Sequence, residues 1–383
     1  MSRRGETIRL ATRGSDLALR QAGQVKEALE SRRHEVELIE VETRGDRLDD
    51  ELIHRLGKTG AFVRSLDQKV LDGEADAAVH SMKDVPTEQP EDLVIAAVPE
   101  RASVGDLLVT PDGQPLEGLP KGATVGTSSL RRGAQLLRAR PDLEIEPLRG
   151  NVDTRVEKLL GPSLQREHER RLEAEEQAAD EEGDADEEED AGEEDDPEFD
   201  QSAEEWFSGL AEIERRAMGR EVETEYDAIV LAAAGLERSG LRRRVPTSEL
   251  PVEEFAPAAG QGALAVTTQD SDLAETVQSA LDDPVARVTT TTERALLAEL
   301  GGGCVAPIGI HAQVQGEYVY VTVQVHSRDG TEVIETTRDL PVERHAAAAR
   351  ELGRKLRDQG AAELVEAARR EADEETEAKR EDA

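Results

Sequence analysis

The stretch Ala77-Ala78-Val79-His80-Ser81-Met82-Lys83-Asp84-Val85-Pro86 decides the fold class of this chain. It starts as a short apolar run, which is typical of a buried strand, and ends at a charged pair and a proline. The carboxyl ends of strands in an α/β sheet commonly present catalytic groups. Asp84, beside Lys83, is therefore a candidate general acid and base. An ordinary Lys-Asp turn and a structural His80 would give the same pattern.

Outward from this stretch, short apolar runs alternate with longer segments of helical periodicity. This alternation predicts an α/β fold built from two similar units. After Pro284 we expect one long helix to Leu300, three strands and a terminal helix from about Val342, which together indicate a small α+β domain. The strands expected in the α/β part cover residues 8–11, 36–41, 75–79, 93–98, 123–126, 145–148 and 227–232, and the helices cover 17–29, 61–71, 129–139 and 152–160.

The composition excludes several classes of protein. With 85 acidic and 47 basic residues, the chain has a formal net charge of −38, which argues against a nucleic-acid partner. A single cysteine excludes a disulfide scaffold, and the sequence lacks the run of roughly 18 to 20 apolar residues that a membrane-spanning helix needs. We therefore expect a cytoplasmic protein. Acidic residues are in excess along most of the chain, which favours a halophilic source.

One segment, residues 161–223, has the composition of an insertion. It holds 26 acidic and six basic residues, and its centre, Ala178–Asp200, is almost purely acidic. Charge repulsion and the lack of apolar side chains predict that this insertion is largely disordered and solvated. The later stretch Ala203–Met218 is amphipathic and could dock locally. A functional acidic partner surface remains the alternative.

Arginines gather where strands are expected to lead into helices. Residues 121–160 carry eight basic and five acidic residues, so the sign of the charge reverses locally. Thr127-Ser128-Ser129-Leu130-Arg131-Arg132 combines free helix N–H groups, hydroxyls and guanidiniums, and similar patterns occur at Thr12–Ser15 and Arg149–Arg155. Three such sites indicate a ligand with several carboxylates or phosphates. The alternative is helix capping with surface ion pairs.

The only cysteine, Cys304, follows three glycines in Gly301-Gly302-Gly303-Cys304-Val305-Ala306-Pro307. Glycines allow a bulky group to approach the backbone closely, so Cys304 is a candidate for a covalent adduct. A small buried side chain is the alternative. No cysteine or histidine stands at ligand spacing from it, and we expect no metal site.

Together these motifs resemble the hydroxymethylbilane synthase family, also called porphobilinogen deaminase. The resemblance extends from Ile8 to about Glu371, apart from the acidic insertion. The motifs occur in the order of the family, and they are residues 12–19, Thr43-Arg44-Gly45-Asp46, 78–86, Val125 to Arg132, 149–155, Ala259-Gly260-Gln261-Gly262 and Gly302-Gly303-Cys304.

The resemblance implies an α/β fold of three domains. Two lobes similar to periplasmic binding proteins would enclose a cleft, and a small α+β domain would carry a dipyrromethane cofactor linked by a thioether to Cys304. Such an enzyme is a transferase of tetrapyrrole synthesis. It joins four porphobilinogen molecules head to tail with release of ammonia, then hydrolyses the product to hydroxymethylbilane. Relatives are usually monomers. The implied domains are 1–99 with 263–281, 100–262 including the insertion, and 282–383.

The resemblance also assigns roles to single residues. Asp84 would move protons and stabilise azafulvene and pyrrole cations, Lys83 would hold carboxylates, and Arg149 would act at the elongating end. Lys58 stands one position earlier than the lysine of the family pattern Gly-Gly-Lys-Gly-x-Phe. The cofactor-binding set is Cys304, Arg131, Arg132, Ser129, Lys58, Asp46 and Thr127, and the substrate-binding set is Arg13, Ser15, Arg155, Arg238, Asn151 and Gln261.

The rival hypothesis is a non-catalytic protein that binds polycarboxylates in the same two-lobed cleft. In that case Cys304 and its glycines would serve only packing. Consumption of porphobilinogen separates the two hypotheses.

Overall fold

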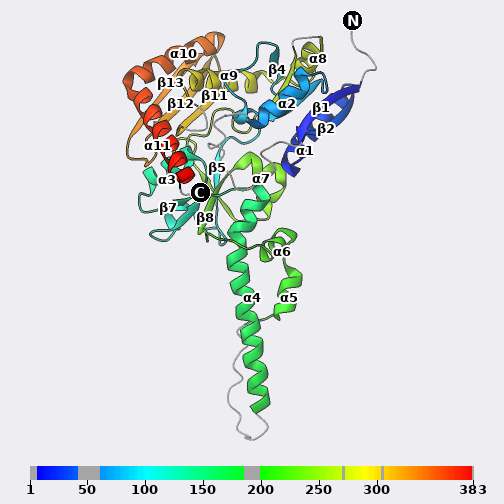
Figure 1. Ribbon diagram of the computed structural model, residues 1–383, viewed down its shortest axis with the longest axis vertical. Helices are drawn as coiled ribbons and strands as arrows, with labels where there is room; N and C mark the ends of the chain where they lie inside the picture. Colours follow the sequence, from blue (N-terminus) through cyan, green and yellow to red (C-terminus); the bar gives the residue numbers. More distant parts are fainter. Residues whose placement is uncertain (1–6, 42–60, 185–198, 270–271, 303–305, 382–383) are drawn as a thin grey trace.

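The computed structural model describes residues 7–41, 61–184, 199–269, 272–302 and 306–381 (Figure 1). The described strands form two five-stranded sheets and one three-stranded sheet. This arrangement confirms the predicted α/β class with a small C-terminal sheet domain. The helices are α1 (Asp16–Ser31), α2 (Ala61–Leu71), α3 (Leu130–Ala139), α4 (Val152–Asp184), α5 (Ala203–Gly209), α6 (Glu212–Met218), α7 (Ala233–Ser239), α8 (Asp272–Leu281), α9 (Pro284–Glu299), α10 (His345–Leu356) and α11 (Ala362–Glu381).

The first sheet has the order β2-β1-β3-β10-β4. Its first three strands are parallel, whereas β10 runs antiparallel to both of its neighbours. Apolar side chains of α1 and α8 cover one face, and those of α2 cover the other. The strands are β1 (Thr7–Arg13), β2 (Glu35–Val41), β3 (Ala77–Ser81), β4 (Leu93–Ala97) and β10 (Leu264–Gln269).

The second sheet repeats this topology with the order β7-β6-β8-β5-β9. Here β6 is parallel to β7 and β8, and β5 is the antiparallel strand between β8 and β9. Helix α3 packs on one face, and α4 and α7 pack on the other. The strands are β5 (Asp106–Val109), β6 (Thr124–Gly126), β7 (Glu144–Glu146), β8 (Ala228–Ala232) and β9 (Thr247–Leu250).

The chain crosses between these two sheets twice. It leaves the first sheet after β4 to enter the second at β5, and it returns after β9 to form β10. The two crossing segments are in contact, because the N–H of Ala102 donates to the carbonyl oxygen of Gly262 over 3.2 Å. Residues of both segments therefore lie where the two sheets approach each other.

The third sheet is an antiparallel meander of β11 (Ile308–Gln315), β12 (Tyr318–His326) and β13 (Val333–Pro341). Alternate residues of β12, including Val319, Val321 and Val323, are fully buried. They form one apolar cluster with side chains of α9, α10 and α11. This confirms the expected helix, three strands and terminal helix of the C-terminal part.

The segment 161–223 differs from its prediction of general disorder. Helix α4 continues to Asp184 through Pro162, and α5 and α6 lie beside it in a projection away from the sheets (Figure 1). The predicted helix ended at Leu160, where the apolar helical pattern stops, and Pro162 within α4 disfavours a helix interior. Packing outweighs that cost here, since a side chain at Gly161 would come within 3.0 Å of the carbonyl oxygen of Ala217 in α6.

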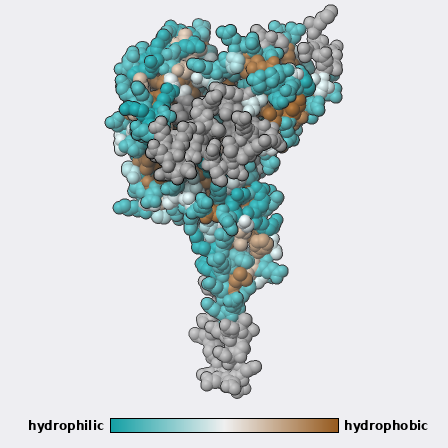
Figure 2. Space-filling model, viewed as in Figure 1, coloured by the Kyte–Doolittle hydropathy of each residue, from teal (hydrophilic) through white to brown (hydrophobic). Residues whose placement is uncertain are grey.

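Ion pairs also join α4 to α6 and the residues after it, at the base of this projection. Glu157 of α4 is 1% exposed and accepts hydrogen bonds from Arg216 and Arg220, the latter over 2.8 Å from its Nε. The local docking expected for residues 203–218 is thus confirmed. Figure 2 shows mainly hydrophilic residues on the visible described surface of the projection, with small apolar patches. The centre of the acidic run, residues 185–198, lies outside the described residues.

Candidate active site

Lys83 and Asp84 lie on a 3-10 turn, η3 (Met82–Asp84), directly after β3. Both side chains are exposed, whereas Met82 is buried. The N–H of Met82 donates to the carbonyl oxygen of Ala263 over 3.0 Å, which ties the turn to β10. Because β1 and β3 are parallel neighbours, Arg13 at the end of β1 lies at the same sheet edge as the turn. Ser15 follows and caps α1.

A close glycine contact joins this turn to the loop of Gln261. Gly260 has φ of +76°, and a Cβ there would lie 2.6 Å from Cγ of Met82 and 3.2 Å from the backbone nitrogen of Lys83. Glycine alone satisfies both the backbone angle and the space. The next residue, Gln261, is 1% exposed, and its amide donates to Oδ1 of Asp106 over 2.9 Å. The loop therefore connects Asp84 to a second cluster.

That second cluster consists of Asp106 and two arginines of α3. Asp106 is 1% exposed and accepts from Arg131 over 2.8 Å and from Arg132 over 2.7 Å. Burial opposes ionisation of Asp106, but the two guanidiniums outweigh it and hold the pKa of this carboxyl well below its usual range. Two positive groups thus share one negative group, which leaves a net positive charge in the interior.

Two guanidinium nitrogens of this cluster have no hydrogen-bond partner among the described residues. Among the described residues, Nε of Arg131 and Nε of Arg132 are buried without a hydrogen-bond partner. Arg131 also donates to Oε1 of Gln135 over 2.9 Å and to the carbonyl oxygen of Ala256 over 3.0 Å. The guanidiniums are therefore held firmly in place but not saturated, as a site for anionic groups requires.

The junction between β6 and α3 behaves as the sequence predicts for a helix start. Ser129 is the N-cap of α3, and its hydroxyl accepts from the N–H of Arg132. Thr127 is buried and its hydroxyl accepts from the N–H of Ser129 over 3.2 Å. Ser128 donates to the carbonyl oxygen of Leu148 over 2.7 Å. Capping and anion binding are both compatible with this geometry.

Arg155 provides a third cation near the two arginines of α3. Burial, and after it the neighbouring charge of Arg132, lower the pKa of Arg155 to about 10. Its Nε donates to the carbonyl oxygen of Gly150 over 2.8 Å, and no acidic side chain of the described chain pairs with it. Asn151 precedes α4 and accepts from the N–H of Thr154 over 3.0 Å. Arg149, two residues earlier, is partly buried.

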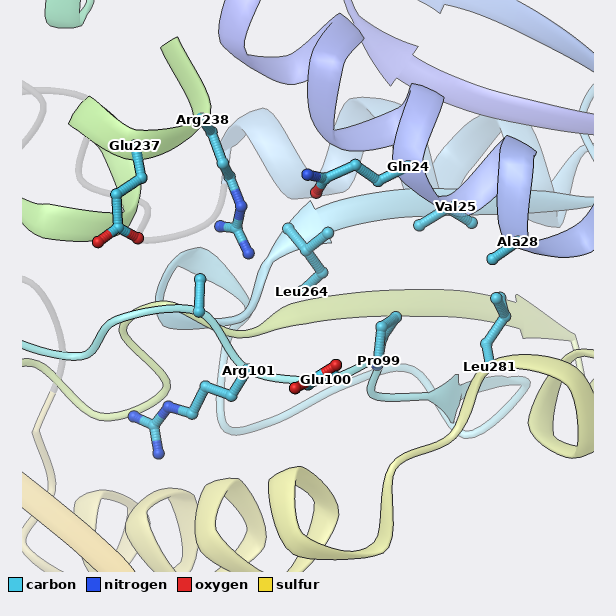
Figure 3. Close-up of a pocket in the computed structure, with 11 residues that line it drawn as sticks. Gln24, Val25, Ala28, Pro99, Glu100, Arg101, Glu237, Arg238, Leu264 and Leu281 are labelled. Carbon is cyan, nitrogen blue, oxygen red and sulfur yellow. The ribbon is translucent and has the colours of Figure 1, made fainter. Parts of the chain in front are cut away.

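Arg238 lies apart from the Asp106 cluster. Its guanidinium donates to the carbonyl oxygen of Gly262 over 2.9 Å, and burial lowers its pKa. It points from α7 into a pocket of about 480 Å³ between α1, α7 and the first crossing segment (Figure 3). Arg238 therefore contacts the second crossing segment at the residue after Gln261.

Three predicted site residues, Asp46, Lys58 and Cys304, lie outside the described residues. Gly302, two residues before Cys304, is described and has a packing role. A Cβ at Gly302 would lie 2.5 Å from Leu297 and 2.7 Å from Ile308. No group of three acidic, histidine or cysteine side chains suited to a metal ion occurs within the described ranges.

His80 is a satisfied structural histidine, which was the alternative to a catalytic role. It is 4% exposed, and its Nε2 lies 2.8 Å from Oδ1 of Asp67 and 3.0 Å from the hydroxyl of Thr267. Its hydrogen bonds join α2 to β3 and β10.

Several residues of the site were missed by the sequence reasoning. Asp106 opens the short run Asp-Leu-Leu-Val, and an acid at the start of a fully apolar strand was a usable signal. Glu293 of α9 is 0% exposed and binds Arg101 through two hydrogen bonds of 2.8 and 2.9 Å. It also accepts from the N–H of Gly260 over 2.7 Å. Nothing in its local sequence indicates this long-range contact.

The family model described as porphobilinogen deaminase, dipyromethane cofactor binding domain, matches residues 8–166 and 212–277, and that of the C-terminal domain matches residues 288–360. The chain belongs to the porphobilinogen deaminase family. A probable porphobilinogen deaminase of Halobacterium salinarum is 56% identical, covering 96% of this chain and 99% of its own. One from Methanococcoides burtonii is 38% identical, with coverages of 94% and 96%.

These matches confirm the predicted family, the activity of a hydroxymethylbilane synthase and the transferase class. The non-catalytic carboxylate-binding alternative is not favoured. The dipyrromethane cofactor is confirmed as the group that this family's domain binds. The relative from a halophilic archaeon agrees with the halophilic composition.

Among the described helices, none has both the length and the apolar character required to cross a membrane. A solved lipoprotein of the YaeC family from Enterococcus faecalis is 16% identical with a TM-score of 0.35, and the match covers 72% of this chain and 91% of that one. This likeness supports no further conclusion.

Proposed function

We propose that condensation takes place where the Lys83–Asp84 turn, the Gly260–Gln261 loop and the arginines of α3 meet. The observation that carries this proposal is the contact of Gly260 with Met82 and Lys83, next to the bond from Gln261 to Asp106. Through it, one loop connects an exposed carboxylate with a buried cluster of net positive charge. Porphobilinogen carries an acetate and a propionate, which such a cluster would attract.

Asp84 is assigned to proton transfer. Loss of ammonia requires a proton on the amino nitrogen of porphobilinogen, and the exposed carboxyl of Asp84 stands at the strand end where a substrate can reach it. When bound, the cofactor supplies the pyrrole carbon to which the first substrate is joined. Lys83 beside Asp84 supplies a cation for a substrate carboxylate.

The arginines are assigned to carboxylate binding. Arg131 and Arg132, whose Nε groups lack a hydrogen-bond partner among the described residues, are assigned to the acid side chains of the cofactor. Arg149 is assigned to the elongating end. Arg13, Ser15, Arg155, Arg238, Asn151 and Gln261 form the proposed substrate set, and Ser129, Thr127, Asp46, Lys58 and Cys304 complete the proposed cofactor set.

Three further assignments belong to this proposal. The domains are 1–99 with 263–281, 100–262 and 282–383, and the separate sheets formed by β1–β4 with β10, by β5–β9 and by β11–β13 support them. The cofactor is held through a thioether to Cys304. The enzyme acts as a monomer in the cytoplasm, where porphobilinogen is its substrate.

The test compares Asp84→Ala with Asp92→Ala, an exposed acid of the same lobe. Porphobilinogen consumption in high salt is expected to fall at least about 100-fold for Asp84→Ala and to be retained for Asp92→Ala. Intact mass of the denatured proteins should show the same pyrrole adduct in both, and none in Cys304→Ser. Equal turnover of the two aspartate variants would remove Asp84 from the mechanism. An active wild type with the bare polypeptide mass would remove the link to Cys304.

A further inference from the structure

Arg294 of α9 contacts the backbone directly after Asp84. Its two terminal guanidinium nitrogens donate to the carbonyl oxygens of Val85 and Pro86, each over 2.7 Å. Burial lowers the pKa of Arg294, and no carboxylate in the described part of the chain pairs with it. Arg294 is partly buried, and partial burial of a cation without a counter-charge costs stability, which its two bonds to backbone carbonyls offset. Its hydrogen bonds to them are charge-assisted and therefore strong.

These contacts complete the support of the turn that carries Asp84. The N–H of Met82 is held by the carbonyl oxygen of Ala263, and the N–H of Val85 closes the turn on Met82 over 3.1 Å. Arg294 holds the exit of the turn, so both ends of η3 are anchored. The turn cannot shift along the sheet edge without breaking one of these bonds.

The residue before Arg294 holds the opposite side of the same site. Glu293 accepts from the N–H of Gly260 and pairs with Arg101, whose Nε donates to the carbonyl oxygen of Gln261 over 2.9 Å. Two consecutive residues of one helix therefore fix the Asp84 turn and the Gln261 loop relative to each other. Helix α9 therefore contacts both the Asp84 turn and the Gln261 loop.

We propose that Arg294 is a positioning residue that holds the carboxylate of Asp84 in its catalytic place. This inference rests on the proposed role of Asp84. Misplacement of a reacting group by about 1 Å can cost about 100-fold in rate, whereas substrate affinity is assigned to other residues, among them Arg13 and Arg155. Loss of Arg294 should therefore lower kcat and leave KM nearly unchanged.

The control is Arg287, which stands two helical turns earlier on α9. It also donates to two backbone carbonyls of the first sheet, those of Ile95 and Ala96, over 3.1 and 2.8 Å. Unlike Arg294, it pairs with Asp282, and the carbonyls that it binds belong to β4 and not to the residues directly after Asp84. Arg287→Gln thus removes a comparable anchor between α9 and the first sheet without releasing that turn.

The experiment measures kcat and KM of Arg294→Gln, Arg294→Lys, Arg287→Gln and Asp84→Ala in high salt, with intact mass to verify the attached adduct. For Arg294→Gln we expect kcat to fall about 10- to 100-fold with KM changed less than about threefold. Arg294→Lys, which keeps the charge but not the two-pronged geometry, should recover part of kcat. Arg287→Gln should retain kcat even if its melting temperature falls as far as that of Arg294→Gln.

Two results would overturn the proposal. One is a kcat for Arg294→Gln equal to that of Arg287→Gln at full adduct loading. The other result applies if Arg294→Gln does not fold, and it is a kcat of Arg294→Lys equal to that of the wild type. In both cases an inactive Asp84→Ala would show that the proposed role of Asp84 stands and that only the positioning role fails. An active Asp84→Ala would instead contradict the proposed function itself.

Discussion

Arginine–carboxylate pairs occupy two opposite environments in this molecule. Around Asp106, the arginines 131 and 132 are 5% and 7% exposed. On the projection of α4, the side chains of the pair Arg166–Glu225 are 57% and 59% exposed. The first pairs lie between α3 and the second sheet, whereas the other joins α4 to the segment that leads into β8.

Burial decides which of these charges determine the geometry of the site. A buried guanidinium has lost its water and needs fixed partners, so each bond around Asp106 determines where a side chain lies. An exposed pair gains little, because water and salt screen both charges. The acidic surface of the projection can therefore vary with little effect on folding, whereas the cluster at Asp106 cannot.

The largest effect is expected from Asp106→Asn. This change keeps the size of the side chain but leaves two buried guanidiniums without a negative partner, so we expect a loss of about 3 to 5 kcal/mol in the free energy of unfolding. Denaturant unfolding in high salt measures it. Asp142→Asn is the matched control, because Asp142 accepts two hydrogen bonds of 2.8 Å from Arg140 at the surface. Equal losses in the two variants would contradict the contrast.

His326 extends the contrast to a buried group with no counter-charge. It is 0% exposed on β12, and both ring nitrogens lack a hydrogen-bond partner among the described residues. Gln324, two residues earlier on the same face of β12, binds Gln135 of α3 over 2.9 Å. Burial, and then the cations Arg138 and Arg131 of α3, lower the pKa of His326 to about 4.

The pH dependence follows from the sign of this shift. The unfolded chain binds a proton on this histidine near pH 6.5, but the folded chain binds it only near pH 4, so stability is lost as the pH falls between the two values. The loss should reach about 3 kcal/mol at pH 4. His326→Met should remove this part of the pH dependence. Parallel unfolding curves for wild type and His326→Met from pH 7 to 4 would refute the assignment.

Local pattern predicted the α/β order because each helix and parallel strand has its own periodicity. It missed β5, β9 and β10, which are short or continue a crossing segment. Their pairing is antiparallel and long-range, for example Val266 with Val79, and no local signal marks it. The start of α3 was predicted correctly, since Ser129 caps a helix whatever surrounds it.

The same is true of the site residues, because contacts between residues far apart in the sequence leave no local signal. Arg131 and Arg132 were selected by their local context, but their partner Asp106 stands 25 and 26 residues away and could not be identified from spacing. The extent of α4 was missed for a related reason. Pro162 signals a helix end, and only the packing of α6 against Gly161 offsets it.

The smallest effect is expected from trimming the projection beyond its anchored base. Deleting residues 168–209 and joining the ends with a glycine-serine linker of about six residues retains Arg216 and Arg220, the partners of Glu157. Turnover should be kept and the unfolding free energy should change less than in the longer deletion below, because the ion pairs removed, Arg170–Glu167 and Arg171–Glu167, are exposed or only partly buried.

Deletion of 161–221 is the contrasting variant. It removes both partners of the buried Glu157 and the apolar residues Ile213 and Ala217 of the same core, so it should destabilise the second lobe by about 3 kcal/mol or more. Denaturant midpoints and porphobilinogen consumption of both variants check this. If the shorter deletion abolished turnover in a folded protein, the exposed end of the projection would take part in the reaction. If both deletions were equally stable, the anchoring ascribed to Glu157 would be wrong.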